Sequence, residues 1–301
     1  MGSVVQTLTQ KGLVRPPGFL PQNVHYETMM GSVAYGVSSD TSDCDVYGFC
    51  IPSKELIFPH LAGEIEGFGR QKKRFDQWQQ HHVHVESENK GQGKEYDLSI
   101  YNIVKYFSLC MENNPNMIDS LFTPQFCVLH ITKIGNMVRE NRKLFLHKGS
   151  WHKFKGYAYS QLHKMRTKDP KGKRLELREK FGFDVKFAYH VVRLLDEAEQ
   201  ILEYGDIDLQ RSREHLKEIR RGEIPEEEIR RWATEKELQL EKLYHESKLQ
   251  HSPDEGKIKA LLLSCLEEHY GSLDKCVVNP DAATVALRQI AEIVERIQKQ
   301  M

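Results

Sequence analysis

The chain has 301 residues, of which 39% are hydrophobic and 29% charged, a composition typical of a soluble globular protein and not of a disordered one. Its 43 lysines and arginines balance 43 aspartates and glutamates, so any contact with nucleic acid must come from a local patch. The six cysteines form no C-x-x-C pair, and no run approaches the roughly 18 apolar residues of a membrane span. We therefore expect a cytoplasmic protein with reduced thiols and no membrane contact.

The first regular elements are predicted to be short strands that follow a lead-in rich in proline and glycine at 11 to 22. Apolar residues alternate over Val24 to Met30, and a second short apolar run spans Asp45 to Ile51, ending at Pro52. The stretch from His82 to Glu86 alternates as well and is typical of a strand or hairpin arm. The core is therefore expected to begin after the lead-in.

From about residue 98 the apolar spacing changes, and helices are predicted for most of the remaining chain. Ile100, Ile103, Val104 and Phe107 fit one helix, which ends near the Asn-Asn-Pro break at 113 to 115. Further helices are predicted over 133 to 147, 151 to 166, 182 to 204, 210 to 221, 225 to 249, 254 to 269 and 280 to 300. The pattern indicates a short sheet followed by a large helical region.

The segment that carries chemistry is GSVAYGVSSDTSDCD, from Gly31 to Asp45, between the two predicted strands. A Gly-Ser turn lets backbone N–H groups approach a phosphate, because Gly31 has no side chain and Ser32 adds a hydroxyl donor. Asp43 and Asp45 are two residues apart on a strand, so they point to the same face and can share divalent cations. Carboxylates that hold Mg²⁺ or Mn²⁺ against a triphosphate are the usual arrangement for nucleotidyl transfer.

This segment resembles the signature of the DNA polymerase β nucleotidyltransferase superfamily, a Gly-Ser turn followed by Asp-x-Asp. Its longer form, GSVAYGVSSDTSDCDVYGFCIP, is similar to predicted bacterial and phage nucleotidyltransferases, some of which are found with RNA-repair genes. Later stretches such as YDLSIYNIVKYFSLCMENNPNMIDSLF extend the resemblance over roughly residues 20 to 225. It implies an α/β fold of the α+β type, with a nucleotidyltransferase core containing a short mixed sheet at 20–125. A helical region at 126–301 would close over the cleft.

The resemblance also implies a third carboxylate, which a later strand supplies at Asp97. With Asp43 and Asp45 it would bind the catalytic metal and assist deprotonation of the attacking hydroxyl, provided that the three carboxylates converge. Three nearby glutamates could serve instead if the strand register differs: Glu86, Glu88 and Glu95.

Three basic residues at helical spacing, Lys186, His190 and Arg193, match the family's basic positions on a later helix. Their spacing places them on one face, where they would receive the triphosphate or a nucleic-acid backbone. The alternative interpretation is an amphipathic helix whose polar face meets water.

Two further clusters are open to a functional interpretation. His82 and His84 would share one face of a strand, but a polar hairpin arm is favoured over a transition-metal site, because no cysteine completes a ligand set. An aromatic and basic cluster is suited either to stacking on a nucleotide or single-stranded RNA, or to a helix core with surface lysines. It comprises Lys153, Lys155, Tyr157, Tyr159, Lys164 and Arg166.

The function that the resemblance implies is metal-dependent transfer of NMP from an NTP to a hydroxyl acceptor, with release of pyrophosphate. An RNA 3′ end is the first choice of acceptor, and a protein hydroxyl or a small molecule comes next. The rival hypothesis is a non-catalytic, antitoxin-like module that keeps the fold and binds a partner protein through its helical half. The three aspartates count against that rival, because a scaffold has no physical need for converging carboxylates.

Overall fold

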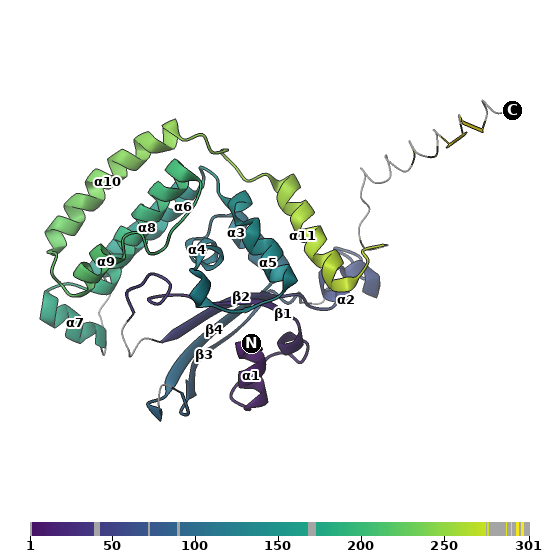
Figure 1. Ribbon diagram of the computed structural model, residues 1–301, viewed down its shortest axis with the longest axis horizontal. Coiled ribbons are helices and arrows are strands. Elements are labelled where there is room, and N and C mark those ends of the chain that lie inside the picture. The colour runs from purple at the N-terminus through teal and green to yellow at the C-terminus, as the bar shows by residue number, and fades with distance from the viewer. Residues whose placement is uncertain are drawn as a thin grey trace.

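A mixed five-stranded sheet at the N-terminal end is followed by a largely helical region in the computed structural model (Figure 1). The structure describes residues 2 to 38, 43 to 71, 73 to 88, 91 to 167, 173 to 274 and 276, and six single positions between 287 and 297. The predicted α/β class, a short mixed sheet followed by helices, is confirmed. The helix predicted over 280 to 300 lies largely outside the described residues, as do positions 39 to 42 of the Gly-Ser motif.

The sheet has the strand order β3-β4-β2-β1-β5. Its strands are β1 (Val24–Met29), β2 (Cys44–Cys50), β3 (Gln77–Val85), β4 (Lys94–Asn102) and β5 (Val128–Ile131). β2 and β4 run parallel, whereas the other neighbouring pairs are antiparallel. β5 pairs with β1, so the sheet continues past the boundary at 125 that was predicted between the two regions.

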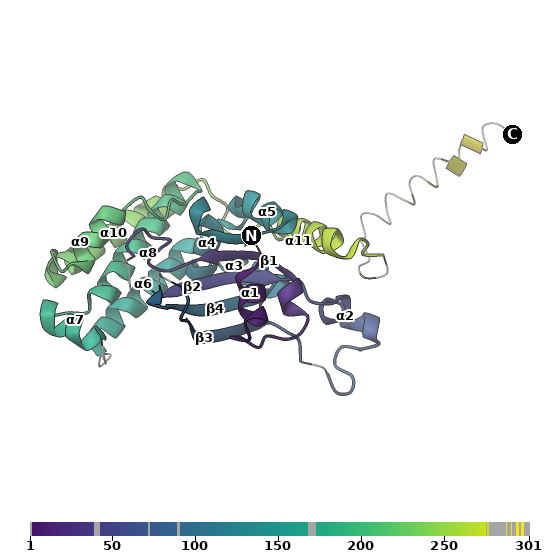
Figure 2. The same ribbon diagram turned by 60° about the horizontal axis from the view of Figure 1, so that its bottom comes forward.

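Helix α1 (Val4–Gln10) covers one face of the sheet, and the larger helical layer lies on the opposite face (Figures 1 and 2). Val5 and Leu8 of α1 are buried among residues of the sheet such as Val24 and Val46. The prediction that the core begins after residue 22 is therefore wrong. Few apolar side chains are needed to dock a helix this short, so the apolar pattern of the sequence does not reveal it.

The N-terminus of α1 is bound by a buried carboxylate of the sheet. Glu27 accepts hydrogen bonds from the Ser3 hydroxyl at 2.8 Å and from the backbone N–H groups of Val4 and Val5 at 2.6 and 3.0 Å. A helix N-terminus has unpaired N–H groups and a partial positive charge, which makes it a suitable partner for a buried anion.

The helical layer begins with α2 and ends with α11. Its helices are α2 (Lys54–Ile57), α3 (Ile103–Met111), α4 (Pro115–Phe122), α5 (Lys133–Glu140), α6 (Ser150–Thr167), α7 (Lys173–Phe181), α8 (Val185–Tyr204), α9 (Arg213–Arg220), α10 (Glu226–Glu246) and α11 (Glu255–Tyr270). α8 packs against α6, α9 and α10, and α11 packs against α5. No helix in the described part of the chain is both long and apolar enough to cross a membrane.

The largest error in the predicted elements concerns residues 98 to 102, which belong to β4 and not to a helix. Leu98 and Ile100 are buried on one face of the strand, and Ser99 and Tyr101 are buried on the other. A strand covered on both faces loses the polar half of its alternation, so it cannot be distinguished from a buried helix by periodicity. The helix begins only at Ile103, after the Asn102 side chain accepts a hydrogen bond from the N–H of Val104 at 3.0 Å.

Candidate active site

Two of the predicted carboxylates lie side by side at the start of the central parallel strands. Asp45 of β2 is directly opposite Asp97 of β4 in the strand register. Neighbouring strands are about 4.8 Å apart, and residues in register point to the same face. That face is the one covered by the helical layer, because Phe49 and Tyr101, further along the same two rows, belong to the main core. The sheet therefore brings two acidic side chains together beside the helices.

The Gly-Ser turn follows β1 and passes directly against Asp45. The N–H of Met30 donates to the carbonyl oxygen of Asp45 at 2.7 Å, which ties the start of the turn to β2. Gly31 has φ +68°, and a Cβ at this position would lie 2.3 Å from Oδ2 of Asp45. Glycine is needed here for two reasons: the left-handed backbone and the space that the carboxylate occupies.

The turn is closed by its own backbone and leaves N–H groups available. The N–H of Tyr35 donates to the carbonyl of Gly31 at 3.3 Å, and the N–H of Val37 donates to the carbonyl of Ser32 at 2.8 Å. Within the described residues, no group accepts a hydrogen bond from the N–H of Ser32 or Val33. Successive free N–H groups in a tight turn form a concavity that binds anions such as phosphate.

The electrostatics of the two strands favour a bound cation. Burial raises the pKa of Asp45, and the negative charges of Asp97 and Asp43 raise it further, whereas the positive charge of Lys186 lowers it. Asp43 is exposed and lies just before the first residue of β2. Oxygen donors on two adjacent strands, with a glycine in place of a bulkier neighbour, fit the coordination that Mg²⁺ or Mn²⁺ requires. Whether Asp43, Asp45 and Asp97 bind a metal together stays a prediction, because the group of potential ligands whose atoms converge in the described part of the chain is His82, Glu95 and Asp97.

A bulge in β3 brings two histidines to Asp97. The pairing of β3 with β4 shifts between Gln80 and Val83, and His82 adopts φ +56°. The backbone N–H of His82 donates to Oδ1 of Asp97 at 2.8 Å, and Nδ1 of His81 lies 3.5 Å from the same oxygen. The bulge interrupts the alternation on which the sequence-based pairing of His82 with His84 depended. It also holds one oxygen of Asp97 in place.

His82 also contacts Glu95, one of the glutamates that could replace Asp97 as a ligand. Nδ1 of His82 and Oε1 of Glu95 are 2.5 Å apart. Among the residues that the structure describes, His82, Glu95 and Asp97 have ligand atoms that all lie within 4.8 Å of one another. The His82 side chain is 83% exposed, however, so the pair is also explained as a surface ion pair.

The three basic positions on α8 do not lie in one environment. Lys186 is exposed in the first turn of the helix, and its charge acts on Asp45. The His190 ring lies 4.1 Å from that of Tyr189 and is half-buried. Arg193 is buried, and its Nη1 donates to Asp119 and Glu197. The structure therefore brings Lys186 toward the aspartates and places Arg193 inside the core, where two carboxylates already occupy it.

Three hydrogen bonds that the sequence analysis does not predict connect the turn to the helical region. The Tyr35 hydroxyl donates to Oδ2 of Asp119 at 2.8 Å. Gln210 donates through Nε2 to the carbonyl of Ala34 at 3.2 Å, and Arg220 donates through Nη1 to the carbonyl of Val37 at 2.5 Å. These contacts join residues far apart in the chain, and only the tyrosine within the motif itself gave a signal that could have been followed.

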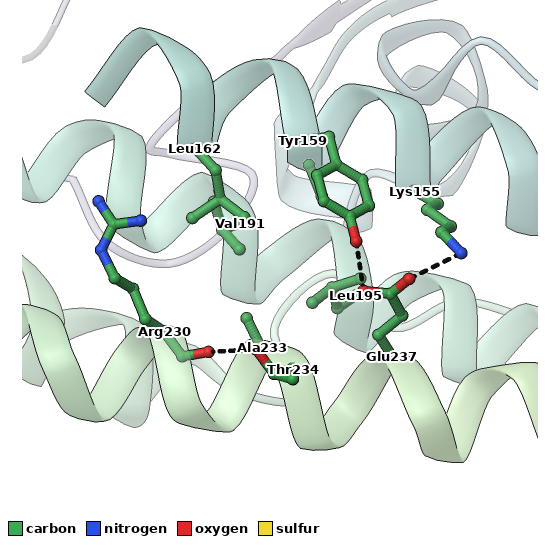
Figure 3. Close-up of a pocket in the computed structure, with 10 residues that line it drawn as sticks. Lys155, Tyr159, Leu162, Val191, Leu195, Arg230, Ala233, Thr234 and Glu237 are labelled. Atoms are coloured by element: carbon green, nitrogen blue, oxygen red, sulfur yellow. Dashed lines mark hydrogen bonds and ion pairs between the residues drawn. The ribbon is translucent and has the colours of Figure 1, made fainter. Parts of the chain in front are cut away.

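The aromatic and basic cluster of α6 is divided between two surroundings. Lys155 and Tyr159 both bind Glu237 of α10, at 2.7 and 2.5 Å, beside a cavity of about 160 Å³ between α6, α8 and α10 (Figure 3). Tyr157 instead accepts a hydrogen bond from Asn114 at 3.0 Å. Lys155 and Tyr159 thus fasten α10 to α6, but Tyr159 is 48% exposed and is not the core tyrosine of the helix-core interpretation.

A Gly-Ser turn that leads into paired strand carboxylates, on a short mixed sheet beside a helical layer, defines a nucleotidyltransferase of the DNA polymerase β type. Residues 10–264 match the family RlaP, described as the RNA repair pathway DNA polymerase beta family. The chain belongs to this family. No curated protein matches the chain. Membership of this family implies divalent metal ions and an NTP, and it connects the protein with RNA repair.

Proposed function

We propose that the protein transfers NMP from an NTP to the 3′ hydroxyl of an RNA and releases pyrophosphate. The observation that carries the proposal is the register of β2 and β4, which sets Asp45 beside Asp97, with Gly31 against Oδ2 of Asp45. An anion-binding turn and a cation-binding pair of carboxylates in contact with each other suit a metal–triphosphate complex and little else.

Each group has a distinct role in this proposal. Asp43, Asp45 and Asp97 would hold Mg²⁺ or Mn²⁺, which when bound neutralises the triphosphate and orients the in-line displacement. The turn at Gly31 and Ser32 receives phosphate oxygens through its free N–H groups. The protein contributes mainly position and fixed charge, which is sufficient for a reaction whose nucleophile and leaving group are both supplied by substrates.

In this proposal, only the basic residues near the N-terminal end of α8 contact the substrate. Lys186 lies in the first turn of α8 and its charge acts on Asp45, which supports a contact between its ammonium group and a phosphate. His190, one turn further along, is the second candidate for this contact. We assign Arg193 no contact with substrate, because it is 5% exposed and bound to two carboxylates.

The charge distribution favours RNA over a protein as the acceptor. The sequence from 164 to 186 has nine lysines and arginines but four acidic residues, in a chain whose total formal charge is zero. Within it, Lys164, Arg178, Lys180 and Lys186 are exposed. Both views place α7 on the side of the molecule where β2 begins (Figures 1 and 2). A local basic rim at the site is what a phosphate backbone requires of a protein with no net charge.

The test is transfer of label from each α-³²P-NTP, with Mg²⁺ or Mn²⁺, to tRNA, short RNA, DNA and protein acceptors. Label that moves to RNA with the wild type and not with Asp45→Asn supports the proposal. Label that moves to a protein hydroxyl instead would support nucleotidyl transfer but contradict RNA as the acceptor.

Binding of NTP distinguishes the proposed enzyme from the alternative hypothesis of a non-catalytic, antitoxin-like module. Metal-dependent stabilisation of the protein by NTP is expected for the enzyme, because a ligand that binds the native state raises its apparent stability. Absence of both transfer and this stabilisation would sink the proposed function in favour of a protein-binding module.

A further inference from the structure

A buried charged unit joins the Gly-Ser turn to α4 and α8; it consists of Tyr35, Asp119, Arg193 and Glu197, and we call it the Arg193 unit. Nη1 of Arg193 donates to Oδ2 of Asp119, the oxygen that also accepts from Tyr35, and to both carboxylate oxygens of Glu197 at 2.9 Å. The guanidinium carbon lies 4.2 Å from the centroid of the Tyr35 ring. None of the four residues is more than 5% exposed.

The pairing within the Arg193 unit is not the one that best satisfies its hydrogen-bonding groups. An arginine and a carboxylate usually form two parallel hydrogen bonds. Here Nη1 alone serves both acids, and Oδ1 of Asp119 and Nε of Arg193 have no partner in the described part of the chain. Unpaired buried polar atoms are costly, so their presence indicates another constraint on the geometry. The guanidinium also lies against the Tyr35 ring, so the tyrosine contacts the Arg193 unit through both its ring and its hydroxyl.

The turn is anchored to the helical region at three successive places. Tyr35 binds the Arg193 unit, Gln210 binds the carbonyl of Ala34, and Arg220 binds the carbonyl of Val37. Its other end is bound to β2 through the N–H of Met30. The position of the turn is therefore set jointly by the sheet, which carries the aspartates, and by the helices.

We infer that Arg193 is a positioning residue, which acts through Tyr35 to fix the free N–H groups of the turn relative to Asp45 and Asp97. The inference rests on the proposed function, and it assigns the Arg193 unit to binding of the NTP and not of the acceptor. A displacement of about 1 Å in such a site is sufficient to reduce the rate about 10²-fold. A turn held only by its own backbone would not be fixed to that tolerance.

The test removes one oxygen atom from the Arg193 unit and compares it with the same change elsewhere. Tyr35→Phe deletes the hydroxyl that reaches Asp119 and keeps the ring under Arg193. Tyr26→Phe is the matched control, because the Tyr26 hydroxyl is also buried and also binds α4, through the carbonyl of Ser120 at 2.7 Å, but lies on β1 and not in the turn. The measurements are the Tm, the affinity for NTP with Mg²⁺ by calorimetry, and the KM values for NTP and RNA.

We expect both variants to lower the Tm, but only Tyr35→Phe to weaken NTP binding and raise its KM, by about tenfold, with the KM for RNA unchanged. Equal effects of the two variants on NTP would overturn the inference and leave a purely structural role. If the wild type binds NTP but labels none of the acceptors, calorimetry still decides the inference while the proposed reaction fails. If the wild type binds no NTP, both fail.

Discussion

Two pairs of acidic side chains flank the Gly-Ser turn, and their surroundings differ. Asp119 and Glu197 share the guanidinium of Arg193 inside the core. Asp45 and Asp97 have no arginine or lysine bound to them in the described residues, although the register of the sheet holds them together. The core pair is bound to a cationic side chain of the chain itself, whereas no lysine or arginine of the described residues binds the strand pair. Among the described residues the strand pair has no arginine or lysine partner, although Asp97 accepts from the N–H of His82, and this difference distinguishes it from the core pair.

The largest effect is expected from removal of the strand pair's charge. Asp45→Asn and Asp97→Asn should each lower kcat/KM about 10³-fold or more, because both positions hold the cation that the reaction needs. Glu95→Gln is the control, since Glu95 lies on the same strand but is paired with His82. Transfer assays decide the matter, and a loss with Glu95→Gln as large as with Asp97→Asn would contradict the assignment of the third ligand.

Removal of the cation that binds the core pair should lower the stability of the protein. Arg193→Met leaves two buried carboxylates without their cation, so the free energy of unfolding should fall by about 3–5 kcal/mol. Arg211→Met removes a similar arginine that binds Asp196 and Glu199 on the outer side of α8, where it is 33% exposed, and should cost about 1 kcal/mol or less. Urea denaturation measures both. Equal losses would show that burial of the Arg193 unit contributes nothing special.

A methyl group between the turn and the strand pair should have a smaller effect. Gly31→Ala strains a backbone with φ +68° and displaces Asp45, so kcat/KM should fall about 10²-fold. Gly63→Ala has the same backbone problem, φ +78°, but no atom within 4 Å of the added Cβ. Strain alone costs about 1–2 kcal/mol. If the two alanine variants transfer NMP equally well, the close approach to Asp45 has no functional weight.

The smallest effect concerns pH. Because folding raises the pKa of Asp45, chiefly through burial, the native state keeps this proton to a higher pH than the unfolded chain does. The protonated carboxyl of Asp45 stabilises the folded protein fully below the pKa of the unfolded chain, 3.8. This stabilisation is lost as the pH rises through the higher pKa of the folded state. Without metal, the Tm of Asp45→Asn minus that of the wild type should therefore increase from acid to neutral pH. A constant difference in differential scanning fluorimetry would contradict this, and saturating Mg²⁺ should reduce it.

The sequence predicts the parts of the site that are local in the chain. Gly31, Ser32, Asp43 and Asp45 lie within one turn and strand, where spacing alone decides which side chains share a face. Asp97 is predicted only by the resemblance, because neither strand alone determines the register of two parallel strands. Its parallel pairing with Asp45 depends on the whole sheet.

The part that could not be predicted is non-local. Tyr35 and Arg193 each bind Asp119, across 84 and 74 residues of sequence. Nothing in the spacing on α8 distinguishes the exposed Lys186 from the buried Arg193, because both fit one helical face. The bulge at His82 likewise has no local signal, since it compensates for a mismatch between two strands. Tertiary packing therefore decides which of these basic residues is exposed and which is buried.

The hydrogen bonds between Glu27 and the N-terminus of α1 have a practical consequence for expression of the protein. Since Glu27 is buried and its partners are Ser3, Val4 and Val5, a fusion tag joined directly to the first residues would compete with a structural contact. A truncated protein that starts at residue 11 would lack these partners, so the Glu27 carboxylate would be buried in the sheet without these hydrogen bonds. Expression vectors for this protein should therefore place a flexible linker before Ser3.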